Sequence, residues 1–276
     1  MFSGLRKPSQ ESRTMKCSST ILLLVASWAS LVGAAEPQRR EWSIDGVARE
    51  ALVYVPESAK TEPSPLVFLW HGHGGRMQLG VRRYQLHKLW PEAIVVCPQG
   101  LNTPGRLTDP QGKKPGWQHS AEQMEGRDLK FFDAMLADLK KENKVDDKRI
   151  YSTGHSNGGG FTYLLWAERG DVFAAVAPTA SAAARAGIAE KLKPKPAFHL
   201  AGRGDPLVKF EWQQATIDRL LQLNQCGEGK PWEEHCTWYD SKLRCPVVTY
   251  IHEGGHEFPA GAEAAIVKFF KGQAKQ

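Results

Sequence analysis

The sequence predicts an α/β fold in which a mostly parallel central sheet carries helices on both faces. Short apolar runs at 66–70 and 93–97 have the pattern of strands that are buried on both faces. From residue 128 to residue 271, segments with helical spacing alternate with further runs of this kind. The sequence shows no internal repeat and no interior linker. We therefore expect one catalytic domain, residues 36–276.

The individual elements follow in chain order. Apolar and polar residues alternate on both sides of Asp45-Gly46, which predicts a hairpin with a tight turn. The stretch 77–89 has the length of a helix, whereas 100–126 is rich in Gly, Pro and polar residues and predicts a long, functional loop. Asp128 caps an amphipathic helix that ends near Asn143. The remaining strands are expected at 149–153, 172–177, 197–201 and 247–251, and the remaining helices at 158–169, 207–224 and 260–271.

Residues 1–35 have the pattern of a secretory signal peptide. A basic start is followed by an apolar run from 21 to 34 and by small residues before Glu36. The apolar run is shorter than the roughly 20 residues that span a bilayer, which favours cleavage over a permanent membrane anchor. We therefore expect a secreted or periplasmic protein without a stable anchor after cleavage.

The charge balance first suggests an acidic partner. The 276 residues include 36 Lys and Arg and 30 Asp and Glu, a net charge of +6. Removal of residues 1–35 takes away four basic residues and one acidic residue, and the net charge falls to +3. The remaining charges are scattered, which is typical of a solvated surface and not of a polyanion site. We expect no nucleic-acid partner.

The cysteines agree with export. Cys226, Cys236 and Cys245 lie within 20 residues, and Cys97 is the fourth cysteine after residue 35. A disulfide within the 226–245 group suits an oxidising compartment, but the sequence leaves the pairing open. Zinc is the alternative, and wide spacings without C-x-x-C argue against it.

Residues 154–158, GHSNG, match the pattern G-x-S-x-G around Ser156. A strand-like segment precedes them and a helix-like segment follows, which is the context of a nucleophile elbow. The alternative is a glycine-rich turn that binds phosphate at a helix N-terminus. No Walker lysine and no G-x-G-x-x-G follow, so Ser156 is favoured as a nucleophile.

A serine nucleophile needs a base to accept its proton, and a carboxylate must orient that base. Asp205 follows the expected strand at 197–201, and His256 follows the one at 247–251. Both therefore lie at carboxyl ends of strands, where open α/β sheets place their sites.

Both positions have rivals. Asp218 and Asp240 are alternative acids. His252 is the alternative base, but it directly ends a strand, whereas Gly254-Gly255 gives His256 the flexible turn that a loop histidine needs.

Residues 71–75, HGHGG, follow the strand at 66–70 and are placed to supply a backbone N–H to a tetrahedral oxyanion. His73 is the favoured donor and Gly74 the alternative, with the N–H of Asn157 as the second donor. Metal binding by His71 or His73 is the rival interpretation, but acidic partners are lacking nearby. We expect no metal and no cofactor.

With these motifs in place, the chain resembles the secreted α/β-hydrolase esterases that are grouped with polyhydroxybutyrate depolymerases, feruloyl esterases and acetyl xylan esterases. The resemblance covers nearly all of 40–272 and lies in PLVFLWHGHGG (65–75), VDDKRIYSTGHSNGG (145–159), FAAVAP (173–178) and the segments 202–208 and 254–259. It implies an α/β-hydrolase fold and the triad Ser156, Asp205 and His256. It also implies that Trp117, with the adjacent Gln118, lines the acyl or sugar site.

Two departures from the family shape the expected substrate. His73 stands where many depolymerases have Cys or Ser, and no polymer-binding domain follows residue 276. We therefore expect a monomeric serine esterase that acts through an acyl-enzyme on a small-molecule or oligosaccharide ester. The alternatives are a serine peptidase of the same fold and a catalytically silent carbohydrate-binding protein.

Overall fold

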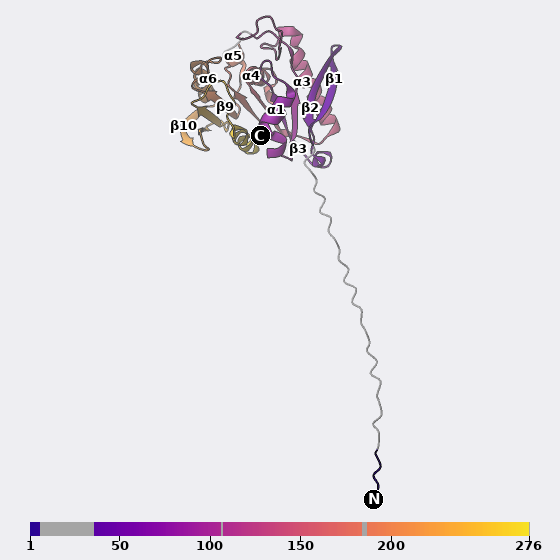
Figure 1. The fold of residues 1–276 in the computed structure, drawn as a ribbon. Helices are drawn as coiled ribbons and strands as arrows, with labels where there is room; N and C mark the ends of the chain where they lie inside the picture. Colours follow the sequence, from indigo (N-terminus) through magenta and orange to yellow (C-terminus); the bar gives the residue numbers. More distant parts are fainter. Residues whose placement is uncertain (6–35, 106, 184–186, 276) are drawn as a thin grey trace. The chain divides into compact units, whose positions relative to one another are not determined.

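The structure, a computed structural model, describes residues 1–5, 36–105, 107–183 and 187–275 (Figure 1). The expected signal peptide lies almost entirely outside the described residues. Residues 34–276 form one compact unit, which is described below. Within the described ranges, no helix combines the length and the hydropathy needed to cross a bilayer.

Ten strands of the described chain form one sheet, in the order β1-β2-β4-β3-β7-β8-β9-β12-β11-β10. The central strands are mutually parallel, namely β4 (Ile94–Pro98), β3 (Ser64–Trp70), β7 (Val145–His155), β8 (Ala175–Thr179), β9 (Ala197–Gly202) and β12 (Val247–His252). Antiparallel strands border them on both sides, namely β1 (Gln38–Ile44) and β2 (Val47–Tyr54), and β11 (Cys236–Ser241) and β10 (Cys226–Pro231). The mostly parallel sheet predicted from the sequence is confirmed.

Alternate side chains of β3 face two separate cores. Leu66, Phe68 and Trp70 belong to one apolar cluster, and Val67 and Leu69 belong to the other. The first face is covered by α3 (Arg127–Glu142), α4 (Asn157–Arg169), α5 (Ile188–Lys191) and α6 (Phe210–Leu223), and the second by α1 (Met77–Tyr84), α2 (Leu86–Leu89) and α7 (Ala262–Lys271). Helices surround the sheet on both faces, as predicted (Figure 1).

The β1–β2 hairpin forms where the sequence predicts it. Asp45 and Gly46 have φ angles of 51° and 79°, the two positive values that a tight two-residue hairpin turn requires. The helix expected at 77–89 is instead two helices, because Gln85 adopts a left-handed φ of 44° between α1 and α2. Strands β10 and β11 were not anticipated. Exposed residues and glycines in β10 give it none of the alternation that signals a strand.

The long loop at 100–126 contains a small hairpin, β5 (Leu101–Asn102) with β6 (Pro115–Gly116), and the short helix η2 (Gln123–Gly126). The other short helices of the described chain are η1 (Glu57–Lys60) and η3 (Gly170–Val172). The four described cysteines are free thiols, and a disulfide in the 226–245 group stays a prediction. Cys226 and Cys236 pack with different core clusters, which keeps that pair apart.

Candidate active site

Ser156 occupies a tight turn between β7 and α4. Its φ of 57° and ψ of −117° are strained for a residue with a side chain, and the surrounding close packing maintains them. A Cβ atom on Gly154 would lie 2.6 Å from the Gly158 carbonyl carbon, and one on Gly158 would lie 2.2 Å from the Trp70 oxygen. Glycine is therefore required on both sides of the serine, as expected for an elbow that lifts Oγ above the sheet.

The turns after three parallel strands bring Ser156, His256 and Asp205 together. The Ser156 Oγ atom lies 2.7 Å from His256 Nε2, and His256 Nδ1 lies 2.7 Å from Asp205 Oδ2. Because the carboxylate can only accept at Nδ1, that nitrogen carries the proton and Nε2 is free to accept from the serine hydroxyl. This is the geometry that proton removal from a serine nucleophile requires.

The rival residues lie elsewhere. Asp240 pairs with Lys230 at 2.6 Å on the β10–β11 hairpin. Asp218 accepts from Gln214 on the exposed side of α6. His252 is engaged through Nδ1 by the N–H of Gly254. None of the three therefore approaches Ser156 in the way that Asp205 and His256 do.

The Asp205 carboxylate is buried and accepts several hydrogen bonds. The N–H groups of Leu207 and Val208 both donate to Oδ1 at 2.8 Å, a turn that fixes the carboxylate against its own chain. Gln213 Nε2 approaches Oδ2 at 3.3 Å, beside the His256 ring. Four donors thus surround one carboxylate, which holds it in the plane that the histidine needs.

Two further buried residues, Gln213 and His199, lie behind this carboxylate. Gln213 Nε2 also donates to the Val208 carbonyl at 2.7 Å, so its Oε1 faces away from Asp205. Gln213 Oε1 and His199 Nε2 are both buried and have no hydrogen-bond partner in the described chain. The Tyr163 hydroxyl and His199 Nδ1 are 2.7 Å apart. Burial lowers the pKa of His199 to about 4, so the ring is neutral and Tyr163 is the donor.

His155 lies beside His256. Its Nε2 is 3.3 Å from the His256 carbonyl oxygen, and its Nδ1 is 3.1 Å from the Thr179 hydroxyl. Burial, with the neighbouring His256, lowers the pKa of His155 to about 3. The neutral ring donates from Nε2 to the His256 carbonyl, which supports the loop that carries His256.

The turn at 71–75 passes directly over the serine. A Cβ atom on Gly72 would lie 3.5 Å from the Ser156 Cβ. The Gly74 N–H donates to the Pro115 carbonyl at 2.7 Å, which removes Gly74 as an oxyanion donor. In the described chain, the N–H of His73 has no backbone acceptor, and the N–H of Asn157 begins α4, where no intrahelical acceptor exists.

The His73 side chain points away from the serine into the long loop. Its Nε2 lies 3.1 Å from Asp109 Oδ2. Cβ atoms on Gly105 and Gly116 would lie 2.9 Å and 2.7 Å from atoms of the ring. The imidazole therefore fits between two glycines and ties the turn at 71–75 to the loop at 100–126.

Trp117 and Gln118 are placed differently from the expectation that they line the acyl or sugar site, since neither has any exposed surface. Trp117 packs against Trp70 and Phe161, and its Nε1–H donates to the His71 carbonyl at 2.8 Å. Gln118 Oε1 accepts from the Asp128 N–H at 2.7 Å, at the start of α3. Both residues support the site from inside the core because the loop folds inward at this point.

Four residues near the candidate site could not be predicted from the sequence. Gln213 lay in a helix without a special pattern, and His199 looked like an ordinary strand residue. Asp109, in the long loop, carried no signal either. His155 occupied a variable position of the motif, so its contact with His256 was not foreseeable. Among the described residues, no group of three or more His, Cys, Asp or Glu is arranged to hold a metal ion.

The solved structures with similar folds include an acetyl xylan esterase from Aspergillus awamori, which is 13% identical with a TM-score of 0.63 and covers 85% of this chain and 99% of that one. At this identity the likeness shows the fold alone, which is the α/β-hydrolase fold. No protein-family model matches the chain.

Similarity in sequence is more specific. Feruloyl esterase D of Neurospora crassa is 28% identical over 77% of this chain and 78% of its own length. A probable feruloyl esterase C of Aspergillus niger is 25% identical over 89% of this chain and 92% of its own length. The chain is a homologue of these carboxylic ester hydrolases.

Proposed function

We propose that this protein is a serine esterase that hydrolyses carboxylic esters through an acyl-enzyme. The observation that supports this proposal is the series of hydrogen bonds from Ser156 Oγ through His256 to Asp205, with both contacts at 2.7 Å. In the proposed reaction, His256 Nε2 takes the hydroxyl proton while Oγ forms a bond to the ester carbonyl carbon. Asp205 orients the ring and stabilises the imidazolium.

The oxyanion that forms is stabilised by the backbone N–H groups of His73 and Asn157. Collapse of the tetrahedral intermediate breaks the bond to the alcohol, and His256 returns the proton to the leaving oxygen. A water molecule then attacks the acyl-enzyme with His256 again as base, which releases the acid and regenerates Ser156. No step in this scheme requires a cofactor.

The proposed substrate is a feruloyl or acetyl ester, as a small molecule or on an oligosaccharide. This proposal is supported by the names of the sequence relatives, which are feruloyl esterases and a bifunctional acetylxylan esterase/xylanase. We further propose that residues 1–35 are a cleaved export signal and that the mature enzyme is secreted, as one catalytic domain.

Hydrolysis of methyl ferulate and p-nitrophenyl acetate tests the proposal. We expect Ser156→Ala to abolish hydrolysis and labelling by a fluorophosphonate probe while the circular dichroism spectrum is unchanged. Ser43→Ala, on the exposed face of β1, is the matched control and keeps full activity. Cleavage of peptide substrates in place of esters would favour a peptidase, and absence of labelling would favour a silent binding protein.

A further inference from the structure

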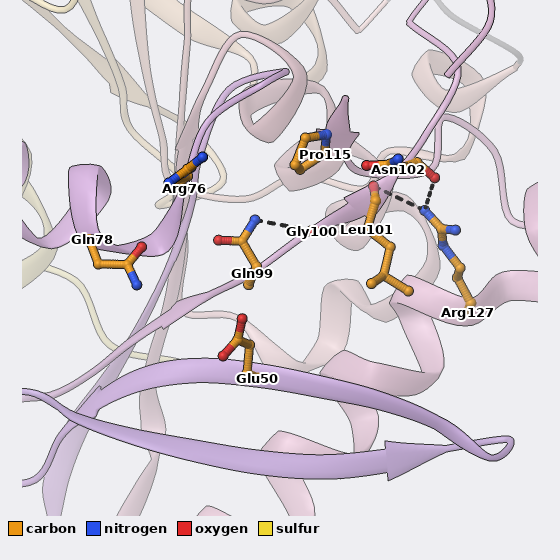
Figure 2. Close-up of a pocket in the computed structure, with 9 residues that line it drawn as sticks. All are labelled: Glu50, Arg76, Gln78, Gln99, Gly100, Leu101, Asn102, Pro115 and Arg127. Carbon is orange, nitrogen blue, oxygen red and sulfur yellow. Dashed lines mark hydrogen bonds between the residues drawn. The ribbon is translucent and has the colours of Figure 1, made fainter. Parts of the chain in front are cut away.

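A cavity of about 580 Å³ lies beside the turn at 71–75 and does not include Ser156, His256 or Asp205 (Figure 2). Gln99 and Gly100, which follow β4, line it. The Gly100 N–H donates to His71 Nε2 at 2.9 Å, and Gln99 Nε2 lies 3.2 Å from the same nitrogen. The cavity therefore shares a wall with the first residue of the turn that passes over the serine.

The cavity is within reach of a substrate bound at Ser156. β4 and β7 are the two neighbours of β3, so Gln99 and Ser156 follow strand ends that are two strand spacings apart, about 10 Å. The surface between them includes Gly74, which is exposed and has no side chain, and the half-buried Pro115. This span corresponds to one or two sugar rings, so one half of a bound ester can extend from the serine to the cavity.

An unpaired arginine determines which ligands the cavity favours. The exposed Arg76 guanidinium has no ion-pair or hydrogen-bond partner in the described chain. Arg127 is different, because its Nη2 donates to the carbonyls of Leu101 and Asn102 at 3.4 and 3.1 Å and its Nε lies 3.5 Å from Asp128 Oδ1, so its charge is already paired (Figure 2). The carboxylate of Glu50 is already engaged, 2.6 Å from Arg39 Nε. The free guanidinium of Arg76 favours a planar carboxylate as the ligand of this cavity.

The other lining residues suit a sugar better than an aromatic acid. Gln78 and Asn102 are exposed amides, which can both donate to and accept from hydroxyl groups. Leu101 and Pro115 supply small apolar surfaces for the face of a sugar ring. No aromatic side chain is among the lining residues in the described chain, so a feruloyl ring would find no stacking partner here.

We propose that this cavity binds the alcohol half of the substrate, and that its ligand is an oligosaccharide carrying a uronic-acid carboxylate. The proposal rests on the proposed esterase function, because it assigns the cavity to the leaving group of that reaction. Arg76 holds the carboxylate, and the amides of Gln78 and Asn102 hold neighbouring hydroxyls.

Kinetics with two feruloylated xylo-oligosaccharides, one with and one without a uronic acid, test the assignment. The wild type has the higher kcat/KM on the acidic substrate. Arg76→Gln lowers the ratio of the two values about tenfold, mainly through KM, because one charge-assisted contact is lost. Arg82→Gln, exposed on α1 and outside this cavity, keeps the wild-type ratio. Equal rates on both substrates, or an unchanged ratio in Arg76→Gln, overturns the assignment.

Calorimetry with Ser156→Ala measures sugar binding to the cavity separately from ester hydrolysis. The titrants are an unesterified xylo-oligosaccharide with one uronic acid and its neutral counterpart. We expect the acidic sugar to bind at least tenfold more tightly, and the added change Arg76→Gln to remove most of this difference. Selective binding without ester hydrolysis by the wild type would reject the proposed function and support the cavity. Hydrolysis of methyl ferulate with equal binding of both sugars would reject the cavity alone.

Discussion

The side chain of Asn157 holds the backbone of Trp117 from both sides. Its Oδ1 accepts from the Trp117 N–H at 2.7 Å, and its Nδ2 donates to the Trp117 carbonyl at 3.0 Å. Asn157 therefore contributes to the site in two ways. Its side chain holds Trp117, and its backbone N–H is a proposed oxyanion donor. The long loop at 100–126 is thus connected directly to the elbow that carries Ser156.

Asn157→Ala should weaken both the fold and the reaction. The buried N–H and carbonyl of Trp117 lose their partners, which lowers the free energy of unfolding by about 2 kcal/mol. Release of the elbow misplaces the donor N–H and lowers kcat roughly tenfold to a hundredfold. Urea unfolding and ester kinetics measure the two effects. Asn157→Asp keeps one of the two contacts with Trp117, so its stability and kcat should lie between those of wild type and Asn157→Ala. A wild-type kcat in Asn157→Ala would show that these contacts do not position the elbow.

Gln213→Leu tests the buried support behind Asp205. The substitution keeps the volume but removes the donor 3.3 Å from Asp205 Oδ2. We expect kcat/KM for methyl ferulate to fall about tenfold. Gln214→Leu changes the next residue of α6, whose amide bonds only to Asp218 at the surface, and is the matched control. Equal activity of the two variants would show that Gln213 does not position the carboxylate.

Asp109→Asn tests the connection between the long loop at 100–126 and the turn at 71–75. The amide gives His73 Nε2 a weaker partner than the carboxylate 3.1 Å away. Because the His73 N–H is proposed to stabilise charge that develops in the transition state, the loss should be mainly in kcat, by about tenfold. Asp45→Asn, in a hairpin turn that tolerates Asn, is the control. A change confined to KM would place Asp109 in substrate binding instead.

Buried neutral histidines should make the protein less stable in acid. Burial lowers the pKa of His71 and of His199 to about 4 and that of His155 to about 3, whereas an unfolded histidine has a pKa of about 6.5. The unfolded chain thus binds more protons in this window, so the free energy of unfolding falls as the pH is lowered from about 6.5 towards 4.

For each of His71 and His199, the loss between pH 7 and pH 5 is about 2 kcal/mol. Urea unfolding at the two pH values measures it. His199→Gln should shrink the difference between the two pH values by about that amount, whatever its effect on stability at pH 7. The surface substitution His235→Gln should leave the difference unchanged. The same pH difference in His199→Gln and wild type would contradict the assignment of a neutral His199.

The elements that could be predicted from the sequence are those with local causes. Buried parallel strands such as β3 and β4 are continuous apolar runs, and the Asp45-Gly46 turn requires residues that accept a positive φ. Strand β10 could not be predicted in this way, because its exposed, glycine-containing sequence favours no strand and it is stabilised by pairing with β11 at the edge of the sheet.

The residues that meet at the candidate site could be predicted from the amino-acid sequence. Ser156, Asp205 and His256 each follow a strand of the same parallel sheet, and parallel strands bring their carboxyl ends to one edge. The surroundings of these three residues, in contrast, follow from the packing of the folded chain. This packing buried Trp117 and Gln118, set Gln213 behind Asp205, engaged Gly74 with Pro115 and left Arg76 unpaired at a cavity. These relations join residues far apart in the chain, and strand order and packing create them, so no local pattern carries them.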